Sequence, residues 1–162
     1  MEQNKTARET GLYDPDVFRL LAEHELSRAQ RYPTPLTLLY ISLYLNEANP
    51  ENAKNVKQLF AGILNSSLRL SDIPSQYGDD FVVLLPSTDE AGGVAASKRL
   101  ISRLKGTRNF ADGNLFKFYI HIGITTHPGG KKKSLDQILN EAQIASQKAK
   151  RIGSQALAVY SG

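Results

Sequence analysis

Cysteine is absent from the 162-residue sequence. Disulfide frameworks, thiolate metal sites and cysteine nucleophiles are therefore excluded. No run approaches the roughly 20 consecutive apolar residues that a membrane-spanning helix requires. The polar residues at positions 1–5 also lack the pattern of a signal peptide. These absences lead us to expect a cytoplasmic protein that makes no membrane contact.

The sequence also lacks the charge pattern of a nucleic-acid surface. Its net charge is +4, and the basic side chains are scattered except for residues 131–133 and the group Lys148, Lys150 and Arg151. No aromatic residues are interleaved with these groups, as they are on a base-stacking surface. We therefore expect no nucleic-acid partner. The run at 131–133 is interpreted as a solvated turn, and contact with a partner's acidic patch is the less favoured interpretation.

What is present is the composition of one globular domain. Hydrophobic residues make up 41% of the chain and charged residues 22%, which at this length suffices for one core. There is no internal repeat and no low-complexity linker. We predict a single domain over residues 1–162, with residues 1–12 as a lead-in.

Helices and strands are predicted to alternate along the chain. Helix starts are marked by Asp14 before Pro15, by a capping box at 87–90 and by a second one at 134–137. The expected elements are helices starting at 14, 49–50, 87 and 134, strands over 36–45, 115–126 and 155–160, a hairpin turning at 78–79, and a left-handed helix end at Gly153. This order predicts an α+β fold with a mostly antiparallel central sheet and flanking helices.

The hairpin is the most informative segment. Gly78 and Asp79 form a turn signal between two short extended runs, and Asp80 and five apolar residues follow. An Arg-x-x-Asp step, made by Arg69 and Asp72, stands at the foot of this hairpin.

The run Tyr77-Gly78-Asp79-Asp80-Phe81 resembles the signature hairpin of the GGDEF family, the diguanylate cyclases. Similar segments follow the family's order at residues 10–13, 25–31, 35–39, 122–124 and 142–153. The resemblance implies a ferredoxin-like, palm-type nucleotidyl-cyclase fold that carries the signature β-hairpin.

The resemblance also implies where the active site would lie, and this chain departs from the family there. Active members use carboxylate-bound metal ions for phosphoryl transfer between two GTP molecules. Ser42 stands at the position of the first metal-binding aspartate, and an uncharged hydroxyl is a poor ligand for Mg²⁺. The hairpin keeps one glycine, Gly78, with Asp79 and Asp80, and Lys150 matches the family's phosphate-binding lysine. We therefore expect a degenerate domain with no catalytic residues, no bound metal and no cofactor.

Other departures lead to the same expectation. The segment from Asn46 to Glu51 is shorter than the family's guanine-reading loop, and Gln143 and Ser154 replace an aspartate and a basic residue of the last helix. The simplest alternative for Gly78, Asp79 and Asp80 is a hairpin turn with no ligand.

The resemblance also implies that a second site of the family is retained. In many active members an Arg-x-x-Asp motif before the signature glycine binds the product, the bacterial second messenger cyclic di-GMP. Arg69 and Asp72 stand at that spacing, and Arg99 matches a second arginine on the following helix. Guanidinium groups suit phosphate and guanine acceptors, and a carboxylate suits guanine nitrogens. The alternative is that Arg69 and Asp72 form an ordinary surface ion pair.

We therefore expect a catalytically inactive signalling domain that acts as a cyclic di-GMP receptor. One alternative is a protein-interaction domain that binds no nucleotide, and a homodimer is compatible with either function. A lesser alternative is an active diguanylate cyclase that uses substitute ligands. His121 is interpreted as a buried histidine of the sheet and not as a metal ligand.

Overall fold

The computed structural model describes residues 6–7, 11–45, 50–106, 110–111, 114–115, 118–153 and 156–161. The described helices are α1 (Pro15–Arg31), α2 (Pro50–Ser67), α3 (Glu90–Gly106) and α4 (Leu135–Ile152). The strands are β1 (Thr6–Ala7), β2 (Leu12–Tyr13), β3 (Leu36–Leu45), β4 (Ile73–Tyr77), β5 (Asp80–Pro86), β6 (Phe110–Ala111), β7 (Asn114–Leu115), β8 (Phe118–His127) and β9 (Ala156–Val159). Among the described helices, none is long and apolar enough to cross a membrane.

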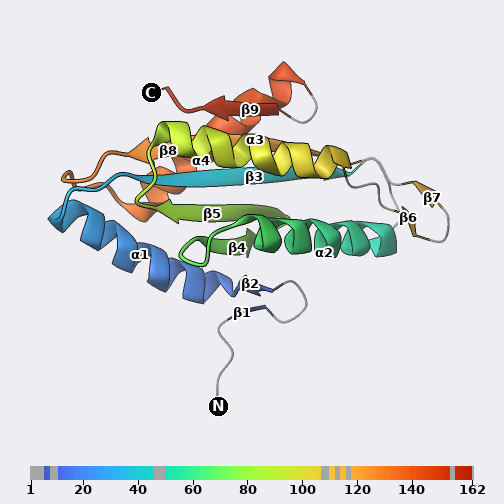
Figure 1. Cartoon of the computed structure of the whole chain (residues 1–162), viewed down its shortest axis with the longest axis horizontal. Helices are drawn as coiled ribbons and strands as arrows, with labels where there is room; N and C mark the ends of the chain where they lie inside the picture. The colour runs from blue at the N-terminus through green and yellow to red at the C-terminus, as the bar shows by residue number, and fades with distance from the viewer. Residues whose placement is uncertain are drawn as a thin grey trace, which may run out of the picture.

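Seven of these strands form one sheet in the order β1-β2-β4-β5-β3-β8-β9 (Figure 1). The neighbours β1–β2, β4–β5, β3–β5 and β3–β8 are antiparallel, whereas β2–β4 and β8–β9 are parallel. The prediction of a mostly antiparallel sheet with flanking helices is therefore confirmed.

Helices cover both faces of the sheet. On one face, α2 and α3 bury Phe60 and Leu100 against Leu39 and Ile41 of β3. On the other, α1 and α4 pack against alternate residues of the same strand, such as Leu38. Successive side chains of a strand point to opposite faces, and β3 is covered by helices on both faces. Both of its rows of side chains are therefore apolar.

The close packing of α4 on β8 depends on one glycine. A Cβ atom at Gly123 would lie 2.0 Å from the carbonyl oxygen of Ala142 and 2.3 Å from the nitrogen of Ser146. Neither backbone atom can move without moving the helix. Gly123 therefore lets α4 approach the sheet beside the central strand.

The predicted capping box at 87–90 is wrong. The nitrogen of Gly92 donates to Oδ1 of Asp89 at 2.9 Å, so Asp89 caps α3 and the helix begins at Glu90. Ser87 has a φ of 51°, and the Thr37 hydroxyl donates to the carbonyl oxygens of Thr88 and Asp89. These bonds keep the chain non-helical for two residues beyond the predicted start, and aspartate caps a helix as well as serine does.

The predicted strand over 115–126 begins too early. Asn114–Leu115 pairs with Phe110–Ala111 in a separate two-stranded ribbon, and β8 starts at Phe118. Leu115 thus belongs to that ribbon, and the β3–β8 ladder runs from the pair Leu45 and Phe118 to the pair Leu36 and His127.

The other helix ends match their predictions, with one difference at Gly153. Asp14 caps α1, and Ser134 caps α4 in a capping box with Gln137. Gly153 ends α4 with φ 151° and ψ −170°, which is a positive-φ extended conformation and not the predicted left-handed one. Asn46, the predicted cap at Asn49, and Ser154 lie outside the described residues, as does the start of the strand predicted over 155–160.

Candidate functional site

The predicted hairpin is formed by β4 and β5. Tyr77 pairs with Asp80, so Gly78 and Asp79 make a two-residue turn. Gly78 has a φ of 63°, which the first position of such a turn requires and which glycine adopts without strain. Gly78 is exposed, and a Cβ added there would meet no atom within 4 Å. The backbone conformation alone therefore accounts for this glycine.

The carboxylate of Asp80 is turned toward β3 and is already hydrogen bonded. The Tyr40 hydroxyl donates to Oδ2 at 2.7 Å, and the Ser42 hydroxyl donates to Oδ1 at 3.4 Å. The backbone nitrogen of Leu43 also donates to Oδ1 at 3.4 Å. Hydroxyl and amide donors thus surround this carboxylate of the hairpin. A metal ion would have to displace them.

Tyr40 is held as a donor by its surroundings. Its side chain is buried, and burial raises the pKa of its hydroxyl well above the ordinary value of 10. The hydrogen bond to Asp80 and the charge of that carboxylate raise the pKa further. Tyr40 therefore keeps its proton at neutral pH and can donate it to Asp80.

The residue before the turn fills space next to this pair. The rings of Tyr77 and Tyr40 meet edge to face, with centroids 5.8 Å apart and an interplanar angle of 78°. In the predicted family signature this position is a glycine, which allows close approach of a nucleotide. Here an aromatic side chain takes that space.

Asp79, the second acidic residue of the hairpin, points to solvent with its side chain 91% exposed. Its Oδ1 lies 2.8 Å from Nζ of Lys57 on α2, and that hydrogen bond lowers the pKa of the Asp79 carboxyl. Asp79 and Asp80 therefore face different partners, and the structure does not bring them together as a pair of ligands.

His121 and Lys150 lie on the α4 side of the same region. His121 is buried and stands opposite Ser42 in the β3–β8 register. Burial lowers its pKa, a hydrogen bond to the backbone of Gly153 opposes this, and the charge of Lys150 lowers the pKa again. Lys150 is exposed on the last turn of α4. The interpretation of His121 as a buried sheet residue is confirmed.

Metal-ligand clusters are absent from the described part of the chain. No group of three or more histidine, aspartate or glutamate side chains there could hold an ion. Ser42 is buried and uncharged, and Asp80 is its only acidic hydrogen-bond partner among the described residues. The residues present at the hairpin therefore do not fit the two-metal centre of a cyclase.

Arg69 and Asp72 meet at the foot of the hairpin, as predicted. Nη2 of Arg69 lies 2.9 Å from Oδ1 of Asp72, and the backbone nitrogen of Arg69 donates to Oδ2 at 2.8 Å. The Asp72 side chain is only 3% exposed, whereas that of Arg69 is 54% exposed. The pair is therefore a buried carboxylate that holds a half-exposed guanidinium group.

The same guanidinium group also contacts the segment at the end of β5. Nη2 of Arg69 also donates to the carbonyl oxygen of Pro86 at 3.0 Å and to Oγ1 of Thr88 at 2.8 Å. Arg69 thus joins the segment that enters β4 to the segment that leaves β5.

Two pockets open on either side of Arg69. One has a volume of about 430 Å³, and Tyr13, Asn65 and Asp72 are among the residues that line it. The other has a volume of about 310 Å³ and lies against Pro35 and Thr88. Arg69 is the one residue that both pockets share.

Arg99 is exposed on α3. Its side chain forms no hydrogen bond or ion pair with Arg69, Asp72 or any other residue that the structure describes. Its guanidinium group is therefore available to a ligand, and its place in the binding site stays a prediction.

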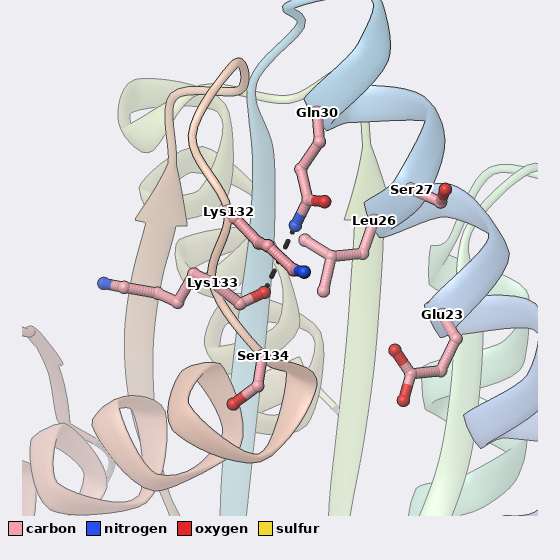
Figure 2. Close-up of a pocket in the computed structure, with 7 residues that line it drawn as sticks. All are labelled: Glu23, Leu26, Ser27, Gln30, Lys132, Lys133 and Ser134. Carbon is pink, nitrogen blue, oxygen red and sulfur yellow. Dashed lines mark hydrogen bonds between the residues drawn. The ribbon is translucent and has the colours of Figure 1, made fainter.

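A third pocket, of about 260 Å³, lies between α1 and the loop before α4 (Figure 2). Gln30 donates from Nε2 to the carbonyl oxygen of Lys133 at 3.3 Å, and Lys132 extends over the pocket. Nζ of Lys133 pairs with Glu141 at 2.6 Å, so one member of the basic run is not a free surface charge. With Glu23 on the opposite wall, the pocket presents both charges and favours no single class of ligand.

Comparisons with known proteins identify the family of this chain. A family model described as "Diguanylate cyclase, GGDEF domain" matches residues 8–156. The chain belongs to the GGDEF domain family. No curated protein matches it significantly.

Solved GGDEF structures superpose on nearly the whole chain. The diguanylate cyclase SiaD from Pseudomonas aeruginosa, solved with its activator SiaC, gives a TM-score of 0.84 at 21% identity over 95% of this chain and 61% of that chain. The FimX GGDEF domain from the same organism gives 0.81 at 20% identity over 97% of this chain and 99% of that chain. The GGDEF domain of DgcB from Caulobacter crescentus, in complex with c-di-GMP, gives 0.83 at 13% identity over 98% and 95%. These likenesses confirm the predicted palm-type cyclase fold.

Sequence reasoning missed two residues of this GGDEF domain. Tyr40 lies two positions before Ser42, so strand alternation places both on one face, and that signal could have identified it as a neighbour of Asp80. Thr88 carried no such signal, because its contact with Arg69 depends on how two loops meet.

Proposed function

We propose that this chain is a catalytically inactive GGDEF domain that binds cyclic di-GMP at the foot of its hairpin. The observation that carries the proposal is Arg69, a half-exposed guanidinium group that is fixed on the buried carboxylate of Asp72. A preorganised arginine of this kind binds phosphate or a guanine acceptor edge with little further loss of side-chain entropy.

We propose different tasks for the predicted binding residues. The two oxygens of Asp72 accept from the side chain and backbone of Arg69, so Asp72 acts by holding the arginine. Arg69 makes the contact with the ligand, and Arg99 supplies a second guanidinium group from α3. The complex of the DgcB GGDEF domain with c-di-GMP supports this choice of ligand.

The absence of cyclase activity follows from the other side of the hairpin. Asp80 is hydrogen bonded to Tyr40 and Ser42, Ser42 carries no charge, and Tyr77 occupies the first glycine position. Lys150 remains as a possible phosphate contact of the former active site. A lysine without a metal centre does not supply the charge neutralisation that phosphoryl transfer needs.

The test is a calorimetric titration of cyclic di-GMP into the wild type and into Arg69→Ala, Arg99→Ala and Asp80→Ala. Each arginine substitution should weaken binding by at least about tenfold, because hydrogen bonds to charged groups contribute about 1.5–3 kcal/mol. Arg69→Lys should restore little, since an ammonium group lacks the planar fork. Asp80→Ala should bind like the wild type.

Salt and GTP provide the controls. Binding should weaken as salt rises, because partly exposed charges are screened over about 8 Å at physiological ionic strength. A titration with GTP and Mg²⁺ should give no heat of binding comparable to that of cyclic di-GMP. If the wild type does not bind cyclic di-GMP at high micromolar concentration, the receptor function is refuted. If only Asp80→Ala abolishes binding, the site lies on the other side of the hairpin.

A protein-interaction domain is the second candidate. It is favoured by the SiaD structure, in which a diguanylate cyclase is in complex with its activator SiaC. Failure of the titration would leave this candidate as the better account of the chain.

A further inference from the structure

We propose that Thr88, in the connection between β5 and α3, is a positioning residue of the cyclic di-GMP site. It holds the guanidinium group of Arg69 so that Nη1 faces the ligand. This inference rests on the proposed function and adds to it a residue outside the Arg-x-x-Asp motif.

The hydrogen-bond inventory of Arg69 shows how the group is oriented. Nη2 carries two hydrogens and has three acceptors, namely Oδ1 of Asp72 at 2.9 Å, the carbonyl oxygen of Pro86 at 3.0 Å and Oγ1 of Thr88 at 2.8 Å. Nε lies 3.3 Å from Oδ1 of Asp72. Nη1 has no partner among the described residues. Its two hydrogens are therefore the donors left for an anionic ligand.

Asp72 precedes β4 and Thr88 follows β5, so two different segments hold the guanidinium group at the foot of the hairpin. Asp72 lies on the same short segment as Arg69 and moves with it. Thr88 lies beyond β5, so it contacts the guanidinium group from a different segment of the chain. Two separate anchors fix the plane of a guanidinium group better than one, because a single carboxylate lets the group swing about the shared edge.

Thr88 is itself fixed at four points. Its nitrogen donates to the carbonyl oxygen of Pro35 at 3.0 Å, and its own carbonyl oxygen accepts from the Thr37 hydroxyl at 2.8 Å. Its hydroxyl donates to the carbonyl oxygen of Pro86 at 2.9 Å. Its methyl group fills the space above Gly92, where an added Cβ would lie 2.7 Å from it. The direction of the Thr88 hydroxyl is therefore set by both packing and hydrogen bonding.

The two halves of this side chain can be tested separately. Thr88→Val keeps the methyl group and the shape but loses the hydroxyl, whereas Thr88→Ser keeps the hydroxyl. Thr34→Val is the matched control, because Thr34 is exposed and its hydroxyl forms no hydrogen bond within the described ranges. All three proteins are titrated with cyclic di-GMP. The order parameter of the Arg69 Nε–H group is measured by NMR without ligand.

Thr88→Val should weaken binding by at least about fivefold, the equivalent of one ordinary hydrogen bond, and should lower the order parameter of Arg69. Thr34→Val should match the wild type in both measurements, and Thr88→Ser, which keeps the hydroxyl, should stay closer to the wild type than Thr88→Val does. An unchanged order parameter or unchanged affinity in Thr88→Val overturns the positioning role while leaving the receptor function intact. A wild type that does not bind overturns the receptor function and, with it, the ligand role of Thr88, whatever the NMR shows.

Discussion

At the scale of single residues, the hydrogen bond from Tyr40 to Asp80 gives a pH-dependent prediction. Tyr40→Phe should lower the unfolding free energy by about 1.5–3 kcal/mol at pH 7, because the acceptor is a carboxylate. The raised pKa of Tyr40 means that the folded state keeps a proton that the unfolded chain loses above pH 10. Wild-type stability should therefore fall as pH rises above 10, by up to about 1.4 kcal/mol per pH unit. Urea denaturation gives the unfolding free energies of both proteins. Their difference should be the same at pH 7 and 9 and smaller at pH 10.5.

Tyr44→Phe is the control for this substitution. Tyr44 is 54% exposed, and its ring stacks on Tyr119, a contact that phenylalanine keeps. Removal of its hydroxyl should lower the unfolding free energy by under about 0.5 kcal/mol. If both substitutions lower the unfolding free energy equally, the hydrogen bond from Tyr40 to Asp80 adds no stability of its own.

At the scale of elements, α2 is held to the sheet by Phe60. This side chain is fully buried, and its ring centroid lies 5.1 Å from that of Phe81 on β5. Phe60→Ala should lower the unfolding free energy by about 3–5 kcal/mol, because it removes apolar contact and leaves a cavity. Lys132→Ala, on an exposed loop, should cost under about 0.5 kcal/mol. Chemical denaturation measures both, and small effects from both would mean that α2 does not bury this face.

Elements were predictable where one local signal decided them. Asp14 before Pro15 placed the start of α1, and the turn at Gly78 placed the hairpin. Prediction failed where a distant segment decided the outcome. Ser87 does not cap α3, because Thr37 of another strand binds the backbone there. The same limit applies to the site. The spacing of Arg69 and Asp72 located it, but the partners of Arg69 beyond β5 depend on tertiary packing.

At the scale of the whole molecule, the purified chain should make no detectable cyclic di-GMP from GTP with Mg²⁺ or Mn²⁺. Two such domains would have to meet with metal ions between them, and neither would bring a carboxylate at position 42. Chromatography of the reaction mixture measures the product. Ser42→Asp alone should not restore activity, because Tyr77 and the donors around Asp80 remain. Product that increases with protein concentration and disappears in Asp80→Ala would contradict the prediction.

The hydrogen bonds around Asp80 also determine which substitutions near the hairpin the fold can accept. Placing an aspartate at position 42 would set a second negative charge beside Asp80 before any metal site existed to bind both, and like charges at such a distance disfavour each other. Replacing Tyr40 first would leave Asp80 without its shortest hydrogen bond. Each single substitution of this kind should therefore lower folding stability before any metal ion could repay the loss.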